Sequence, residues 1–182
     1  MQRPAPIPGV PIGLEYLTQI DSLYVQQQVS MLEAFVGWET NNKYVVYNSA
    51  QQQVFFAVED TDTCMRICCG SQRRFEIKIM DNLRQEVIRV KRDFKCCAGC
   101  CWCAGCCNGC AHEVVVESPP GNVVGYVRQT GSLWKAAYDI MDENRNTILK
   151  IRGPCCICDG NIFLMLLSFL FFKGLLVRCF EL

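Results

Sequence analysis

The sequence lacks both the usual side chains of an enzyme active site and an excess of charge of either sign. Its 182 residues include a single histidine, His112, and no nucleophile elbow, P-loop or H-E-x-x-H motif, so conventional catalysis has no candidate residues. Lysine and arginine together number 18, as do aspartate and glutamate. Without net charge, no broad electrostatic field favours nucleic acid. We therefore expect a protein that is not an enzyme and has no nucleic-acid partner.

A secretory signal is also missing from the sequence. The first residues, MQRPAPIPGVPIGLEYL, contain one arginine and no apolar core, which excludes the usual signal-peptide pattern. We expect a reducing compartment, in which the fifteen cysteines are thiols, metal ligands or acylated side chains. An odd number of cysteines also argues against complete internal pairing.

What the chain has instead is a dense run of cysteine. Between Cys96 and Cys110 it reads CCAGCCWCAGCCNGC, fifteen residues of which eight are cysteine. Four interpretations are open: a metal cluster, a redox relay, a disulfide knot and an acceptor of fatty acids. The C-x-x-C pairs of this run abut one another, whereas zinc sites usually separate two such pairs by a dozen residues or more. His112 opens a predicted strand and is more typical of a surface residue than of a ligand. Flanking strands also disfavour the redox interpretation, because a reactive C-x-x-C usually opens a helix.

Acylation fits the run best physically. Stable anchoring needs two acyl chains, or one chain beside basic charge, and both are available here. The candidate acceptors are Cys96, Cys97, Cys100, Cys101, Cys103, Cys106, Cys107 and Cys110. The candidate membrane-facing basic residues are Arg89, Lys91, Arg92 and Lys95. The sequence thus predicts fatty acyl chains on this loop and a phospholipid membrane as partner.

The middle of the chain predicts an antiparallel β meander. Runs of β-branched and aromatic residues alternate with polar turns, and Phe75 to Ile79 alternate apolar with charged side chains, as in a sheet with one wet face. The expected strand pairs are 44–47 with 54–58, 75–79 with 87–90, 114–116 with 123–127, and 137–140 with 148–151. Three cysteine clusters, at 64–69, 96–110 and 155–158, fall in the connections and should gather at loop ends of the sheet.

The two ends of the chain differ from this domain. Residues 1–12 form a proline-rich segment that is either a plain linker or, through Pro8 and Pro11, a docking site for SH3 or WW modules. We expect one helical turn or two from Leu14 to Ile20, capped by Asp21. Residues 13–160 form the predicted β domain with its Cys-rich loop 96–110. Residues 161–182 are a hydrophobic tail, which predicts either a buried or peripheral helix or a marginal membrane span.

Several segments, in the same order along the chain, resemble those of phospholipid scramblases. They are Pro8–Asp21, Gly37–Thr40, Val54–Asp60, Asp81–Asn82 with Glu86–Ile88, Pro119–Gly121 with Gly125–Val127, and Gly153–Cys155. The resemblance implies a mainly β, tubby-like antiparallel barrel with a hydrophobic C-terminal helix. It also implies ATP-independent, calcium-activated movement of phospholipids in both directions across the bilayer. The implied location is the cytoplasmic face of the plasma membrane, with palmitate on the Cys-rich loop, where Cys100, Cys101, Cys103, Cys106 and Cys107 are the nearest counterparts.

The chain departs from the family pattern in two places. The proline of the family's Cys-rich motif is missing, and alanine and glycine occupy its place. After Cys158, where the family continues with more strands and an Asp-rich calcium segment, this chain runs into its hydrophobic tail. We therefore expect an incomplete barrel in a truncated or divergent member, without the family's metal ligands. Glu59, Asp60 and Asp62 are more typical of a solvated loop than of a calcium loop. The alternatives are a palmitoylated adaptor without transport and a soluble zinc-binding β domain.

Overall fold

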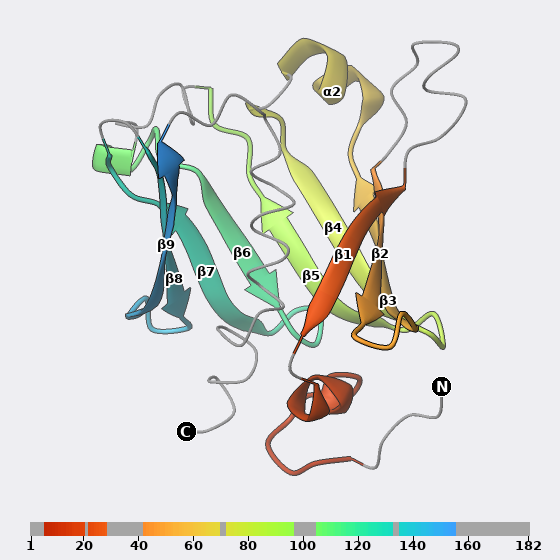
Figure 1. The fold of residues 1–182 in the computed structure, drawn as a ribbon. Coiled ribbons are helices and arrows are strands. Elements are labelled where there is room, and N and C mark those ends of the chain that lie inside the picture. The colour runs from red at the N-terminus through yellow and green to blue at the C-terminus, as the bar shows by residue number, and fades with distance from the viewer. Residues whose placement is uncertain are drawn as a thin grey trace.

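Nine antiparallel strands, each paired with the next along the chain, form the sheet that dominates the protein. A computed structural model describes residues 6–20, 22–28, 42–69, 72–96, 105–132 and 135–155. The strands are β1 (Leu23–Gln28), β2 (Lys43–Asn48), β3 (Gln53–Asp60), β4 (Phe75–Asp81), β5 (Glu86–Arg92), β6 (Glu113–Glu117), β7 (Val123–Gln129), β8 (Lys135–Asp142) and β9 (Thr147–Cys155). The 3₁₀ helix η1 (Glu15–Gln19) precedes β1, and the α-helix α2 (Thr63–Cys69) connects β3 to β4. Figure 1 shows the curved sheet, with β5 and β6 between the β1–β2 and β8–β9 pairs.

Alternation of side chains along the strands places the core on one face of the sheet. In β4, Phe75, Ile77 and Ile79 are buried, whereas Glu76 and Lys78 lie on the other face. Successive residues of a strand point to opposite faces, so this pattern permits one register only. Each such side chain contributes about 2 kcal/mol by its burial. Leu14 and Leu17, beside and within η1, pack into the same core, which ties the start of the domain to the sheet.

Three of the four tight hairpin turns have the same design. A residue with a short side-chain acceptor ends the first strand: Asn48, Asp81 or Asp142. Its Oδ1 accepts a hydrogen bond from the backbone amide four residues on, at 2.9, 2.9 and 2.7 Å. The third residue after it has a positive φ, of 58° to 65°. The side chain thereby replaces backbone partners in the turn, which sets the register of β2–β3, β4–β5 and β8–β9.

The connections at the two ends of the sheet differ in length. The tight turns lie at one end, and the longer connections lie at the other (Figure 1). The far end holds α2, the connection from β5 to β6 and the C-terminal end of β9. In an antiparallel meander every second connection returns to the same end, so these three segments must share it. They are the segments that contain the cysteine clusters.

The four hairpins expected from the sequence are confirmed as β2–β3, β4–β5, β6–β7 and β8–β9. The expected helix from Leu14 is the shorter 3₁₀ helix η1. Strand β1 was not among the expected strand pairs, and helix α2 was not predicted. The observed architecture is a nine-stranded antiparallel sheet in which β1 and β9 have a single neighbour each among the described strands.

Two expectations concern residues that the structure does not describe. The hydrophobic tail at 161–182 and Asp21 both lie outside the described ranges. Within those ranges, no helix has the length and apolar character that crossing a membrane requires.

Candidate functional site

The described thiols gather at the end of the sheet where the long connections lie. Cys64, Cys68 and Cys69 belong to α2, and Cys96, Cys106, Cys107 and Cys110 belong to the connection between β5 and β6. All seven are free thiols, and five of them are exposed. The expectation that the cysteine clusters gather at loop ends is therefore confirmed for these residues. Cys97, Cys100, Cys101 and Cys103 lie outside the described residues.

The second half of the Cys-rich loop packs closely on the turn between β7 and β8. A Cβ atom added to Gly105 would lie 2.2 Å from the carbonyl carbon of Thr130, and one added to Gly131 would lie 2.3 Å from Sγ of Cys106. Glycine is thus needed at position 105, where a side chain would meet backbone, whereas at position 131 the Cys106 side chain would have to move. The contact holds Cys106 at the rim of the sheet, where this residue is exposed.

Hydrogen bonds tie the two ends of the Cys-rich loop together. Nζ of Lys95 donates to the carbonyl oxygens of Asn108 and Ala111, at 3.2 and 3.1 Å. The amide of Ala111 donates to the Cys107 carbonyl at 2.9 Å. Backbone hydrogen bonds from Gly109 and Cys110 lower the pKa of the Cys107 thiol. The fold thus presents Cys107 on a closed turn, with an environment that favours its thiolate, the nucleophilic form.

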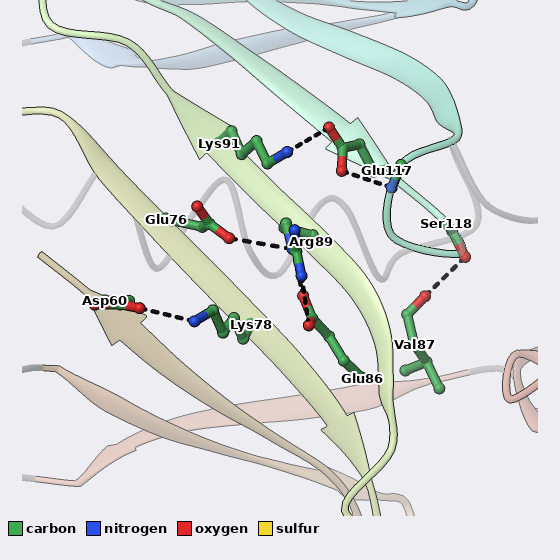
Figure 2. Close-up of polar contacts among 10 residues, drawn as sticks. Asp60, Glu76, Lys78, Glu86, Val87, Arg89, Lys91, Glu117 and Ser118 are labelled. Carbon is green, nitrogen blue, oxygen red and sulfur yellow. Dashed lines mark hydrogen bonds and ion pairs between the residues drawn. The ribbon is translucent and has the colours of Figure 1, made fainter.

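The predicted basic residues of β5 lie in a ladder of ion pairs on the outer face of the sheet (Figure 2). Nε of Arg89 lies 3.1 Å from Glu76 and 2.5 Å from Glu86, and Nζ of Lys91 lies 2.7 Å from Glu117. Partly exposed ion pairs contribute little to stability, typically less than about 1 kcal/mol. They do neutralise the cations locally, so the positive field outside β5 is weaker than the sequence alone implies.

Arg92 differs from its neighbours because it turns to the core face. Its guanidinium lies 4.4 Å over the centroid of the Phe75 ring and donates to the carbonyl oxygen of Arg73 at 2.8 Å. Burial lowers the pKa of Arg92 to about 10. The four predicted basic residues therefore occupy three environments: the ion-pair ladder for Arg89 and Lys91, the aromatic contact for Arg92, and the base of the Cys-rich loop for Lys95. Their role toward a membrane remains a prediction.

A buried carboxylate attaches α2 to the sheet. Glu59 of β3 lies 3.3 Å from Nη2 of Arg66, in α2, and 2.8 Å from Nη2 of Arg73. It also accepts from Thr61 at 2.7 Å and from Asn42. Burial disfavours the charged form, yet these hydrogen bonds and the charge of Arg73 hold the pKa of Glu59 below its usual range. The interpretation of Glu59 as part of a solvated loop was therefore wrong, because its side chain is buried between two arginines. Alternation along β3 places Glu59 inward and was the signal that could have revealed this.

His112 is half-buried at the start of β6 rather than on the surface. Burial, followed by the charges of Arg92 and Lys95, lowers its pKa to about 4. Among the described residues no group of three or more His, Cys, Asp or Glu side chains is placed to hold a metal ion.

Comparison with known proteins identifies relatives across almost the whole chain. The family model described as Scramblase matches residues 1–166. Phospholipid scramblase 1 of Homo sapiens is 46% identical over 159 residues, which are 87% of this chain and 48% of that protein. Phospholipid scramblase 2 of Bos taurus is 46% identical over 158 residues, 86% of this chain and 52% of that protein.

A more distant relative is phospholipid scramblase family member 5 of Homo sapiens, 40% identical over 159 residues and 56% of its own length. The chain thus spans about half the length of the curated relatives it matches. No solved structure matches it.

Proposed function

This chain belongs to the scramblase family, and we propose that it moves phospholipids between the two leaflets of a membrane, in both directions and without ATP. The match over residues 1–166 is the observation that supports this proposal. We place the protein at the cytoplasmic face of the plasma membrane, as the family resemblance implies. The sheet end that contains the thiols is the part of the molecule that faces the bilayer.

Acyl chains on the Cys-rich loop provide the proposed anchor. Cys106 and Cys107 are exposed at the rim of the sheet, and the contact of Gly105 with Thr130 keeps them there. Acyl groups on two thiols of one loop suffice for stable membrane attachment. Lys95, at the base of the loop, adds basic charge near the membrane surface.

Calcium activation, which the family resemblance implies, is a separate part of the proposal. The described residues do not fit a calcium site, since none of their acidic side chains gather in a group that could hold a metal ion. No step of lipid movement is therefore derived through calcium. A calcium requirement is to be measured together with transport.

Reconstitution in liposomes tests the proposed transport. Full-length protein is inserted into vesicles with a fluorescent phospholipid in both leaflets, and dithionite then quenches the label of the outer leaflet. If the protein scrambles lipids, quenching should proceed beyond the label that was in the outer leaflet. The assay is run once with calcium and once with a chelator. Quenching that stops at the level of protein-free vesicles under both conditions would contradict the proposal. Membrane binding without lipid exchange would instead favour an anchored adaptor.

A variant with all eight loop cysteines changed to serine tests the anchor independently of transport. We expect a smaller share of this variant than of the unaltered chain in the membrane fraction of expressing cells. Cys69→Ser, which alters a half-buried thiol outside the loop, is the matched control and should stay at the membrane. Equal membrane fractions for the eight-serine variant and the unaltered chain would contradict anchoring by the loop.

A further inference from the structure

Helix α2 has an unusual density of sulfur. Four of its seven residues, Cys64, Met65, Cys68 and Cys69, contain sulfur. Cys64 and Cys68 are four residues apart, which places them on the same side of a helix one turn from each other. Their Sγ atoms lie 3.9 Å apart.

The two sides of α2 have opposite character. Arg66 points inward to Glu59 and is buried, which fixes the rotation of the helix on the sheet. The outward side presents Cys64, Ile67 and Cys68, all exposed, and Thr63, the first residue of α2, is exposed as well. Ile67 is 75% exposed, and none of these three outward side chains is charged. An outward helix face made of two thiols and a large aliphatic side chain is poorly suited to water.

This face lies at the same end of the sheet as the Cys-rich loop. Antiparallel topology returns the β3–β4 and β5–β6 connections to one end, and Figure 1 shows α2 there. Phe94, 45% exposed and beside Cys96, adds a second apolar side chain at this end. Arg74, directly before β4, is exposed and basic, and the exposed carboxylate of Asp62, directly before α2, offsets its charge. Exposed thiols, apolar side chains and a cation are the components of a lipid-anchoring surface.

We propose that Cys64 and Cys68 of α2 form a second S-acylation site, which takes long-chain fatty acyl groups and anchors α2 in the membrane beside the Cys-rich loop. This inference rests on the proposed function only in that the protein must meet a membrane. It assigns to α2 a part in anchoring that is separate from the loop.

The chemistry is transfer of an acyl group between thiols. Sγ of Cys64 or Cys68, as thiolate, attacks the carbonyl carbon of a long-chain acyl-coenzyme A, directly or through an acyltransferase that has accepted the acyl group. The new carbon–sulfur bond forms the cysteine thioester, the bond to coenzyme A breaks, and coenzyme A takes the proton as free thiol. No oxidant or reductant takes part.

Two other uses of the thiol pair fit the geometry less well. Cys64 and Cys68 are free thiols with their Sγ atoms 3.9 Å apart, and the reducing compartment expected from the sequence disfavours their oxidation to a disulfide. A structural metal site requires four ligands, and the described residues contain no group of even three His, Cys, Asp or Glu side chains around a common point. Acylation needs only that each thiol be accessible, as both are.

Acyl exchange on the full-length protein, expressed in cultured mammalian cells, tests the proposal. Free thiols are blocked, thioesters are cleaved with hydroxylamine, and each released thiol receives a maleimide-polyethylene glycol tag. The unaltered chain is compared with Cys64→Ser/Cys68→Ser, with the eight-serine loop variant and with the combination of both. We expect the loop variant to retain one or two tags and the combined variant to lose them. Cys69→Ser, the matched control on the same helix, should keep the full number.

Peptide mapping of the unaltered chain gives a measurement that does not depend on the folding of any variant. Trypsin releases residues 44–66, in which Cys64 is the only cysteine, and residues 67–73, which contain Cys68 and Cys69. We expect hydroxylamine-dependent labelling of Cys64 and Cys68 and none of Cys69. Both peptides recovered as free thiols, or joined as a disulfide, would overturn the proposal.

The outcomes separate this inference from the proposed function. Labelled α2 cysteines in a protein that moves no lipid would support the second acylation site and contradict the transport proposal. Lipid exchange with unlabelled α2 cysteines would do the reverse. Loss of every hydroxylamine-sensitive tag in the loop variant would assign all acylation to the loop and overturn the role of α2.

Discussion

Oε1 of Glu59 lies 2.8 Å from Nη2 of Arg73, and the Glu59 side chain is only 3% exposed. The carboxylate also lies 3.3 Å from Nη2 of Arg66, so one buried charge connects β3, α2 and the start of β4. We expect Glu59→Gln to lower the free energy of unfolding by about 3 kcal/mol, because it removes a buried anion from between two cations. Urea unfolding followed by circular dichroism measures this.

The exposed pair one residue further along is the matched control. Asp60 and Lys78 are 2.7 Å apart, but the Asp60 side chain is 61% exposed. Asp60→Asn should therefore cost less than about 1 kcal/mol. Equal losses for Glu59→Gln and Asp60→Asn would show that burial does not strengthen the Glu59 network.

Glu59 also predicts a dependence of stability on pH. Its pKa in the folded protein is lowered, so its contribution is present above the unfolded pKa of about 4.3 and is lost as the pH falls through the folded value. We expect the unaltered chain to lose more stability than Glu59→Gln on acidification below pH 4. Parallel stability profiles for the two proteins would contradict this.

Protonation of His112 should lower the stability of the protein at a higher pH than protonation of Glu59 does. Its folded pKa is about 4, against an ordinary value of 6.5, so the unfolded chain takes up the proton first. The contribution of His112 to stability is complete above pH 6.5, and it declines as the pH falls from there to the folded pKa. Between pH 7.5 and 5 we expect a loss of about 2 kcal/mol. In His112→Gln this loss should disappear, as measured by urea unfolding at both pH values. A His112→Gln protein that loses as much would contradict the prediction.

Two substitutions in the turn between β4 and β5 should have opposite effects on stability. Oδ1 of Asp81 accepts from the amides of Leu83 and Gln85, at 2.8 and 2.9 Å. Asp81→Ala removes both acceptors, and we expect a loss of about 1 kcal/mol. Arg84 has a φ of 59°, a region that glycine adopts without strain, so Arg84→Gly should preserve or raise the melting temperature. A lower melting temperature for Arg84→Gly would show that the Arg84 side chain contributes to the turn.

The Cys-rich loop contains two glycines that should respond differently to alanine. In Gly105→Ala the new Cβ would meet the backbone of Thr130 at 2.2 Å, whereas in Gly109→Ala its nearest neighbour would be Sγ of Cys107 at 3.9 Å. We expect Gly105→Ala to cost about 2 kcal/mol through overpacking and Gly109→Ala to be nearly neutral. Hydrogen exchange of the amides at 105–111 would locate the effect. Unchanged exchange in Gly105→Ala would contradict the close contact.

Local patterns accounted for much of the sheet. Alternation from Phe75 to Ile79 predicted strand β4 and its buried face, and polar clusters such as the one at Asp81 predicted the tight turns. Strand β1 was missed because three consecutive glutamines hide its alternation. Helix α2 was missed because seven residues, rich in cysteine, are too few for a clear helical period. The candidate loop was predicted from composition, and its gathering with the cysteines at 64–69 at loop ends followed from the predicted meander, but the helical form of Thr63–Cys69 was not part of either pattern.

The sequence by itself determined the meander, its turns, the Cys-rich loop and the resemblance to phospholipid scramblases. These features depend on the spacing of residues along the chain. Because side chains of a strand alternate between the two faces of a sheet, the spacing alone shows which residues share a face. Only the tertiary structure decided which cations are neutralised, since Arg89 meets Glu76 and Lys91 meets Glu117 through pairing between strands. It alone placed Arg66 of α2 against Glu59 and turned Cys64 and Cys68 outward, because the rotation of a helix on a sheet follows from contacts between residues distant in sequence.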